Sequence, residues 1–281
     1  MEEFIITSVQ NAKIKHVVAL QQKSALRREE GLFVVEGQRE IEHCIACGYE
    51  ITEMFYCPDR LRSPENLATL ENLGSLGSLG LPSPLAVSAA VYEKMAYREG
   101  TEGIIAVAKC KEHRLKNLSL PKAPLIIVLE SVEKPGNLGA ILRTAEGAHV
   151  DAVIVCDPLT DLYNPNLIRA SIGGMFSVPT AVCTSKECIS FLKTNKIRIF
   201  TAQLQDSYDY YDYNMCGATA IVMGTESTGL TNIWREAADV HIRIPMLGRL
   251  DSLNVSVSAA ILMYEAVRQR NKVYRHPDAR M

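Results

Sequence analysis

The sequence predicts an α/β protein whose C-terminal part holds a parallel sheet, and two observations lead to this fold class. Continuous apolar runs at 125–129, 152–156 and 219–223 are typical of strands that are covered on both faces. Helical patterns at 138–148, 165–174 and 256–269 alternate with or follow these strands. Because alternation of this kind places helices on both faces of a parallel sheet, we expect ligands at the carboxyl ends of the strands.

The first 110 residues predict a separate, smaller α/β unit. Its expected strands are short and apolar, and they lie at 32–37, 54–57, 85–87 and 104–108. Its expected helices are at 17–23, 39–47 and 89–95. The repetitive segment 73–84 predicts a surface loop. Lysine-rich residues 111–122 predict a linker, which leaves 1–110 and 123–281 as the two domains.

Composition limits the function classes. The net charge of -2 argues against a protein that coats nucleic acid by bulk electrostatics. A basic cluster near the N-terminus could neutralise RNA phosphates, or it could be a solvated helix face balanced by Glu29 and Glu30. This cluster contains Lys13, Lys15, His16, Lys23, Arg27 and Arg28.

The eight cysteines and the apolar runs bear on the cell compartment. Irregular spacing favours reduced thiols over a disulfide framework. Cys44 and Cys47 form a C-x-x-C pair on a predicted helix, but without a second pair at zinc spacing we expect no metal. No apolar run reaches membrane-spanning length, and the first residues lack a signal-peptide pattern, so a cytoplasmic location is expected.

The first motif with chemical interest runs from Glu133 to Ala145. Pro135 and Gly136 turn the chain after a strand, and Asn137 is expected to cap the helix that follows. The expected core stripe of this helix is Leu138, Ile141, Leu142 and Ala145. Arg143 lies about 200° around the helix from Ile141 and therefore points away from the core. It is either a functional side chain or a solvated arginine near Glu146.

The second motif, 224–230, directly follows the strand at 219–223. Gly224 and Gly229 flank Glu226, and glycines at a strand's carboxyl end let the backbone approach a ligand closely. The pattern is not a dinucleotide fingerprint, because G-x-G-x-x-G is absent. A simple surface turn is the alternative.

The third motif joins Ile244, Pro245 and Met246 to the segment 252–256. Ser252 or Asn254 is expected to cap the last helix. The expected core stripe of that helix consists of Val257, Ala260, Ile261, Tyr264 and Val267.

Together, the three motifs in this order resemble the SpoU/TrmH branch of the SPOUT methyltransferases, and the resemblance covers essentially the whole chain. It also includes Asn11, the segment 33–37, and the segments 161–165 and 169–173. It implies a C-terminal α/β domain with a deep trefoil knot, preceded by a small substrate-binding domain, and usually a homodimer. It further implies methyl transfer from S-adenosylmethionine to a ribose 2′-hydroxyl of RNA.

The resemblance assigns roles to residues. The implied cofactor-binding residues are Gly224, Gly229, Ile244, Met246 and Leu253. The implied catalytic residues are Asn137, Arg143, Glu226, Ser252 and Asn254. Because a guanidinium normally stays protonated, we expect Arg143 to hold an RNA phosphate and stabilise negative charge rather than act as the base. Lys13, Lys15, Arg27 and Arg28 are expected to contact RNA, and no metal is implied.

By its likeness to the rRNA-modifying members of this family, the form of the first motif, residues 135–139, implies ribosomal RNA of the 23S type rather than tRNA. Two other function classes stay open at this point. A non-catalytic RNA-binding factor that retains the fold would be expected to lose Asn137, Arg143 or Glu226, and all three are present. A nucleotide-binding regulator would bind S-adenosylmethionine without methylating RNA.

Overall fold

The computed structural model describes residues 5–61, 81–97, 102–225 and 228–274. Its contacts divide the chain into an N-terminal unit, Met1–Glu112 with Leu162–Phe176, and a C-terminal unit, His113–Asp161 with Ser177–Met281. The loop expected at 73–84 lies mostly outside the described residues, as does Glu226. Among the described residues, no helix is both long and apolar enough to cross a membrane.

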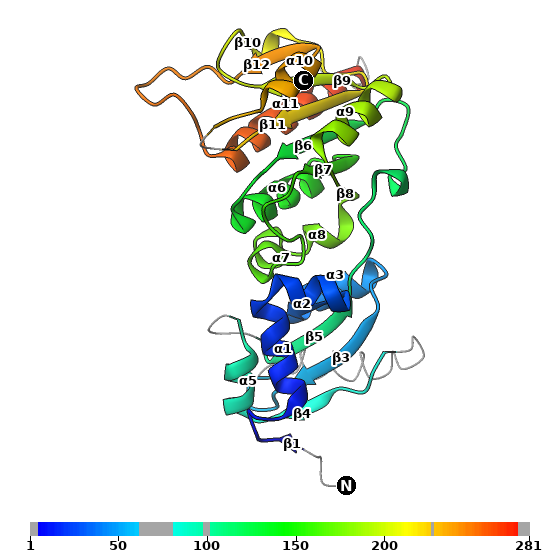
Figure 1. Cartoon of the computed structure of the whole chain (residues 1–281), viewed down its shortest axis with the longest axis vertical. Coiled ribbons are helices and arrows are strands. Elements are labelled where there is room, and N and C mark those ends of the chain that lie inside the picture. Colours follow the sequence, from blue (N-terminus) through cyan, green and yellow to red (C-terminus); the bar gives the residue numbers. More distant parts are fainter. Residues whose placement is uncertain (1–4, 62–80, 98–101, 226–227, 275–281) are drawn as a thin grey trace, which may run out of the picture. The chain divides into compact units, whose positions relative to one another are not determined.

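The N-terminal unit is built on a mixed sheet with the strand order β1-β4-β3-β5-β2. Figure 1 labels β1, β4, β3 and β5 of this sheet. Strands β2 and β3 are antiparallel to β5, whereas β4 is parallel to β1 and β3. The strands are β1 (Ile5–Ile6), β2 (Leu32–Glu36), β3 (Ile51–Tyr56), β4 (Leu85–Val87) and β5 (Ile104–Lys109). The helices are α1 (Ala12–Gln22), α2 (Ser24–Glu30), α3 (Gln38–Ala46), α5 (Ala89–Met95) and, from the later segment, α7 (Pro165–Ser171).

An aromatic cluster explains why residues 162–176 belong to the N-terminal unit and not to the expected domain 123–281. The ring centroids of Tyr163 and Phe176 lie 4.3 Å and 6.0 Å from that of Phe33, in β2. Tyr49 packs edge-on against Phe176, and the Tyr163 hydroxyl accepts a hydrogen bond from the Lys111 amide at 2.8 Å. Burial raises the pKa of Tyr49 to about 12, so its phenol stays neutral and serves packing.

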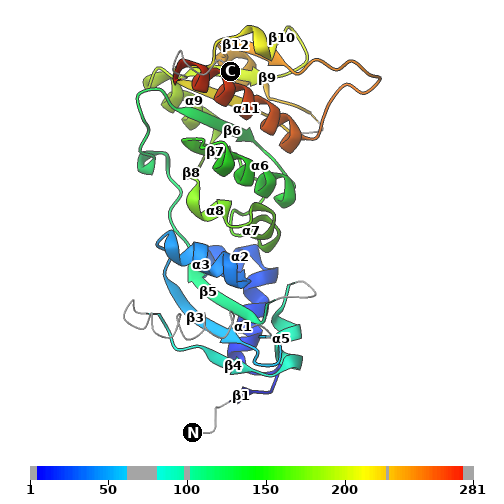
Figure 2. The same ribbon diagram turned by 180° about the vertical axis from the view of Figure 1, so that it is seen from behind.

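The C-terminal unit confirms the predicted parallel sheet. Seven strands within the described residues pair in parallel in the order β10-β12-β9-β11-β6-β7-β8. Figure 2 shows this sheet from behind, and β11 is labelled in Figure 1. They are β6 (Leu125–Glu130), β7 (Ala152–Cys156), β8 (Thr180–Cys183), β9 (Arg198–Ala202), β10 (Tyr208–Asp209), β11 (Thr219–Met223) and β12 (Val240–Arg243). The helices are α6 (Pro135–Gly147), α9 (Ser185–Thr194), α10 (Asn232–Ala237) and α11 (Val255–Tyr274). Helix α8 (Gly174–Ser177) spans the boundary, because its first three residues belong to the N-terminal unit. Short 3-10 turns occupy Leu115–Asn117 and Tyr210–Asp212.

The first predicted helix cap is wrong. Helix α6 begins at Pro135, with Lys134 in the capping position, so Asn137 is the third residue of the helix. Proline suits the first helical position because its ring fixes φ and that position needs no amide donor. The expected stripe of α6 is confirmed, since Leu138, Ile141, Leu142 and Ala145 are fully buried.

The predicted core stripe of α11 is also wrong in its phase. The side chains that α11 buries are Val255, Ala259, Leu262, Met263 and Ala266. Val257 and Tyr264 are instead 48% and 51% exposed. Helix α11 packs on α6, and that contact sets the buried face. An apolar stripe is therefore left on the outside of α11.

A buried carboxylate fixes the start of α10 at the carboxyl edge of the sheet. Glu130, at the end of β6, is 3% exposed and accepts hydrogen bonds from the Thr231 amide at 2.9 Å and the Thr231 hydroxyl at 2.6 Å. Ser185 in turn accepts a hydrogen bond from the Trp234 indole at 3.0 Å, and its hydroxyl oxygen lies 3.3 Å from a Glu130 carboxylate oxygen. These bonds anchor the far end of the loop that follows β11.

We expect Glu130→Gln to lower the free energy of unfolding by about 1–3 kcal/mol, because a buried acceptor facing the Thr231 amide becomes in part a donor. Urea unfolding followed by circular dichroism measures this change. Glu146→Gln, at an exposed position of α6, is the control and should unfold like the wild type. Equal midpoints for all three proteins would contradict the anchoring role of Glu130.

Candidate active site

The C-terminal unit has a cavity of ≈ 340 Å³ at the carboxyl edge of its sheet. Five segments line it: the residues after β9, the loop after β11, helix α10 through Arg235, the segment after β12 and the start of α11. The sequence-predicted residues that line it are Gly224, Gly229, Ile244, Met246, Ser252 and Leu253. The volume is in the range of pockets that hold cofactors. All five expected cofactor-binding residues therefore meet around one space.

The wall of this cavity depends on a close approach of two glycines. A Cβ atom added to Gly224 would lie 2.3 Å from the carbonyl carbon and oxygen of Gly229, and 2.6 Å from the Leu230 nitrogen. Gly229 has a φ of +68°, and its amide donates to the Thr225 carbonyl at 3.1 Å. The loop thus folds back on itself directly after β11, and position 224 accepts only glycine.

Two polar atoms on the cavity wall lack hydrogen-bond partners among the described residues. The Gln203 side-chain oxygen and the Arg235 Nε are both buried and unsatisfied. Both residues line the cavity, whose other walls include Met223, Leu230 and Ile242. An unmet buried polar atom costs about 1–3 kcal/mol, so such atoms indicate a ligand that supplies the partners. This wall suits a ligand that is largely apolar and also carries an anionic acceptor and a donor.

A second cavity of ≈ 130 Å³ adjoins the first and shares Gly224, Thr225 and Val255 with it. Asn137 lines this smaller cavity, and its side-chain oxygen accepts a hydrogen bond from the Asn254 amide group at 3.2 Å. The Asn254 side-chain oxygen also accepts a hydrogen bond from the Ser256 backbone amide at 2.9 Å, so Asn254 caps α11. Of the two expected cap residues, Ser252 and Asn254, the second is therefore the cap. The first and third motifs therefore meet next to the second.

Arg143 is not brought to these cavities within the chain. It is exposed on α6 and lines neither of the two. Arg143 is six positions after Asn137, so the two side chains point in directions about 240° apart around the helix axis. Glu226 lies outside the described residues, so its expected role stays a prediction.

The basic cluster of the N-terminal unit is only partly available to a ligand. Lys13, Lys15 and Arg28 are exposed, and Lys13 forms an ion pair with Glu53 at 2.7 Å. Arg27 is only 2% exposed and donates to the Leu20 and Gln21 carbonyls. The expected RNA contact of Arg27 is therefore wrong, because this guanidinium is used to satisfy the last carbonyls of α1.

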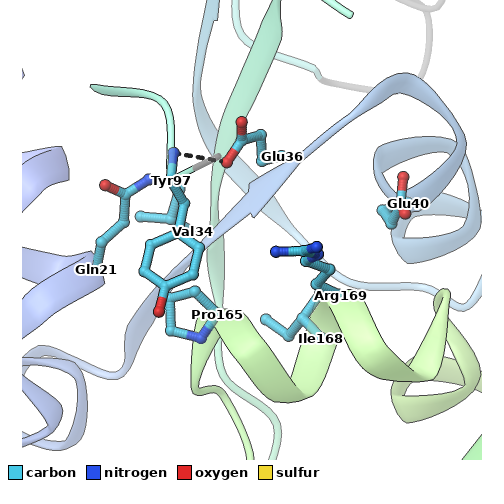
Figure 3. A pocket seen from close by; sticks show the side chains of 8 residues that line it. All are labelled: Gln21, Val34, Glu36, Glu40, Tyr97, Pro165, Ile168 and Arg169. Carbon is cyan, nitrogen blue, oxygen red and sulfur yellow. Dashed lines mark hydrogen bonds between the residues drawn. The ribbon is translucent and has the colours of Figure 1, made fainter. Parts of the chain in front are cut away.

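A further hollow in the N-terminal unit is too small for a cofactor. Figure 3 shows it between β2, α3 and α7, with Glu36 accepting a hydrogen bond from the Tyr97 amide at 2.9 Å. Its volume is ≈ 20 Å³, which is enough for about one water molecule.

Sequence reasoning missed Gln203 and Arg235. Gln203 directly follows β9, and the run at 197–202 would have placed it at the carboxyl edge had it been assigned as a strand. Arg235 lies in α10, whose six residues are too short to show a helical period.

A parallel sheet with a cofactor-sized cavity at its carboxyl edge, formed by a glycine loop and a helix start, is the architecture of an α/β enzyme. The sequence profile of the SpoU rRNA Methylase family matches residues 124–264, and that of the MRM3-like substrate binding domain matches residues 11–106. The chain belongs to the SpoU rRNA methylase family. This membership confirms the resemblance based on the three motifs.

Individual relatives cover most of the chain. The 23S rRNA (guanosine(2553)-2′-O)-methyltransferase RlmP of Bacillus subtilis is 27% identical over 259 residues, which are 92% of this chain and 97% of the relative. The 23S rRNA (guanosine-2′-O-)-methyltransferase RlmB of Vibrio vulnificus is 35% identical over 181 residues, 62% of this chain and 73% of the relative.

Solved structures are similar over both units. A crystal structure described as an RNA 2′-O ribose methyltransferase is 37% identical, with a TM-score of 0.82 over 95% of this chain and 100% of that chain. The SpoU methyltransferase AviRb from Streptomyces viridochromogenes, in complex with the cofactor AdoMet, is 25% identical, with a TM-score of 0.83 over 93% of this chain and 100% of that chain.

We expect Gly224→Ala to weaken binding of S-adenosylmethionine, the ligand of the AviRb complex, by at least about tenfold. The added methyl group collides with the Gly229 carbonyl and forces the loop out of place. Isothermal titration calorimetry measures the affinity. Gly217→Ala, whose Cβ would meet nothing within 4 Å, is the matched control. Unchanged affinity in Gly224→Ala would show that the loop does not shape the binding site.

Proposed function

We propose that the protein is an S-adenosylmethionine-dependent RNA 2′-O-ribose methyltransferase that acts on ribosomal RNA of the 23S type. The observation that carries this proposal is the meeting of the glycine loop, the Ile244–Met246 segment and the Asn137–Asn254 pair around one cavity, in a chain of the SpoU family. RlmP and RlmB, whose names specify 23S rRNA, favour ribosomal RNA over tRNA as the substrate.

The residues of the large cavity fit S-adenosylmethionine. Arg235 offers a charged donor for the carboxylate of its methionine end, and the Gln203 oxygen offers an acceptor for the ammonium group. Ile244, Met246 and Leu253 offer apolar contacts for the adenine and the thioether. When bound, this cofactor supplies a methyl group that is activated by its positive sulfur.

The polar residues beside the cavity serve the ribose. The Asn254 amide group donates a hydrogen bond to the Asn137 side-chain oxygen, and the pair orients the sugar, with Ser252 on the adjoining wall. Glu226 is proposed to act with them. Arg143 remains a cation at neutral pH, so it is suited to grip the neighbouring phosphate and to stabilise negative charge that develops on the 2′-oxygen.

A homodimer would complete the site, with Arg143 supplied by a second copy of the chain. Two observations support this proposal. Arg143 is exposed and lines neither cavity of its own chain. In addition, Val257 and Tyr264 form an exposed apolar stripe on α11, two turns apart, and Leu247 and Leu250 before the helix are 98% and 75% exposed. The deep trefoil knot around the cavity is part of the same proposal.

The N-terminal unit is proposed to bind RNA, with residues 1–110 as the substrate-binding domain, 111–122 as the linker and 123–281 as the methyltransferase domain, apart from residues 162–176, which pack in the N-terminal unit. The match of residues 11–106 to a substrate binding domain and the exposed Lys13, Lys15 and Arg28 support this assignment. A cytoplasmic location is part of the same proposal.

The test of the proposed function is methyl transfer itself. Purified protein is incubated with radiolabelled S-adenosylmethionine and with either ribosomal RNA or tRNA from cells that lack its gene. We expect label at a ribose 2′-oxygen of the large ribosomal RNA, located by alkaline-resistance mapping. Label in tRNA alone would overturn the substrate assignment. Cofactor binding without label in any RNA would favour a regulator or an RNA-binding factor.

We expect Arg143→Lys to lower turnover by about 10²–10³-fold while leaving S-adenosylmethionine affinity unchanged, because a lysine lacks the planar fork of donors. Single-turnover kinetics and calorimetry separate the two quantities. Subunit mixing then tests the source of Arg143. When Arg143→Lys and Gly224→Ala chains are mixed, a shared site should restore about a quarter of wild-type activity, since half of the dimers then hold one intact site. No recovery in proven mixed dimers would place Arg143 in its own chain's site.

We expect Arg235→Ala to weaken S-adenosylmethionine binding by about ten- to a hundredfold, through loss of a charge-assisted hydrogen bond. The affinity for 5′-methylthioadenosine, which lacks the carboxylate, should not change. Calorimetry with both ligands checks this difference. An equal loss for the two ligands would indicate general damage to the cavity and not recognition of the carboxylate.

A further inference from the structure

Three cysteines of the C-terminal unit lie together, apart from the cavities described above. Cys156 ends β7, Cys183 ends β8, and Cys188 is the fourth residue of α9. Their sulfur atoms all lie within 4.8 Å of one another. Cys156 and Cys183 are register partners in neighbouring parallel strands, and α9 starts two residues after Cys183 and so carries Cys188 back over the strand ends. All three thiols are free.

The spacing of the sulfur atoms is close to that of a metal–thiolate site. With a zinc–sulfur distance of about 2.3 Å, ligand sulfurs in a tetrahedral or trigonal site are about 3.8–4.0 Å apart. Because no pair of sulfurs is more than 4.8 Å apart, side-chain rotations that shorten each separation by at most about 1 Å would bring the three sulfurs to that geometry. The strand ends and the helix therefore hold the ligands nearly in place before any ion binds.

The surroundings favour a soft ion with one open position. Thiolates select zinc and copper(I) over calcium and magnesium. Cys156 and Cys188 are fully buried, whereas Cys183 is partly exposed and gives a route for the ion and a water ligand. Asp157 accepts hydrogen bonds from the Ser185 amide at 3.0 Å and the Ser185 hydroxyl at 2.6 Å, so its carboxylate is already in use.

We propose that Cys156, Cys183 and Cys188 bind one Zn²⁺ ion through three thiolates, with a water molecule in the fourth position on the side of Cys183. Each thiol releases its proton to solvent when it binds, and no electrons are transferred. The site is distinct in place and in chemistry from the methyl-transfer site. Its ion would tie β7, β8 and α9 together, next to Ser185 and its contacts with Glu130 and Trp234.

The test uses the full-length reduced protein, freed of metal by a chelator and titrated with Zn²⁺ against a chromophoric competitor. We expect one equivalent bound per chain, and a thiolate-to-metal charge-transfer band when Co²⁺ replaces Zn²⁺. Cys183→Ser should lose the binding and the band. Cys216→Ser, which changes a partly buried cysteine of the same unit outside the cluster, should retain both.

A second measurement covers the case in which Cys183→Ser does not fold. In the wild-type protein, Zn²⁺ should slow alkylation of Cys183 by iodoacetamide, as followed by peptide mass spectrometry, and leave alkylation of Cys216 unchanged. Substoichiometric binding to the wild-type protein, or equal protection of both cysteines, would overturn the proposal.

Discussion

The candidate site depends on one backbone contact that leaves no room for a side chain. Gly224 follows the last residue of β11 and touches the Gly229 carbonyl, which closes the loop into one wall of the cavity. The end of this loop is held by a different force, the buried Glu130 carboxylate on Thr231. The close Gly224–Gly229 contact at one end of the loop and the charge-assisted Glu130–Thr231 bonds at the other together fix where α10 begins. They therefore also fix where Arg235 lies.

Packing of α11 on α6 creates the second half of the site. The contact joins Asn254, which caps α11, to Asn137 in the first turn of α6, although 117 positions separate them in sequence. Neither asparagine is in the core, so the packing of the two helices, and not burial of the amides, brings them together. The same packing turns Val257 and Tyr264 outward, so that one helix serves both the cavity and an apolar outer face.

Sequence reasoning succeeded where a local pattern reflects burial on both sides. The strands β6, β7 and β11 are predominantly apolar, and the segments that follow β6 and β11 carry the first two motifs. It failed where a distant contact decides the outcome. The sequence predicted Arg27 as a surface cation, but its guanidinium is buried and donates hydrogen bonds to two carbonyls at the end of α1. The phase of α11 was misjudged because its apolar residues occur on more than one face, and only the position of α6 selects between them.

Other elements were missed for lack of signal. β12 alternates apolar and polar residues over four positions, and β10 is two residues long. Without these strands, the sequence did not show that Gln203 and Ile244 lie at the same carboxyl edge of the sheet. The motif residues at that edge were nevertheless predicted. The predicted Asn137 cap failed because Pro135 provides a stronger start for α6 than an asparagine two residues later.

The excursion of residues 162–176 into the N-terminal unit has a consequence for how the gene can be divided. A single cut in the chain does not separate the two units, because residues 162–176, between β7 and β8 of the C-terminal unit, belong to the N-terminal unit. A fragment that starts at residue 113 would carry Tyr163 and Phe176 without the rings of Phe33 and Tyr49 that shelter them. Such a fragment would expose these aromatic rings to solvent and tend to aggregate. Replacing the N-terminal unit of this chain therefore requires residues 162–176 to be replaced with it.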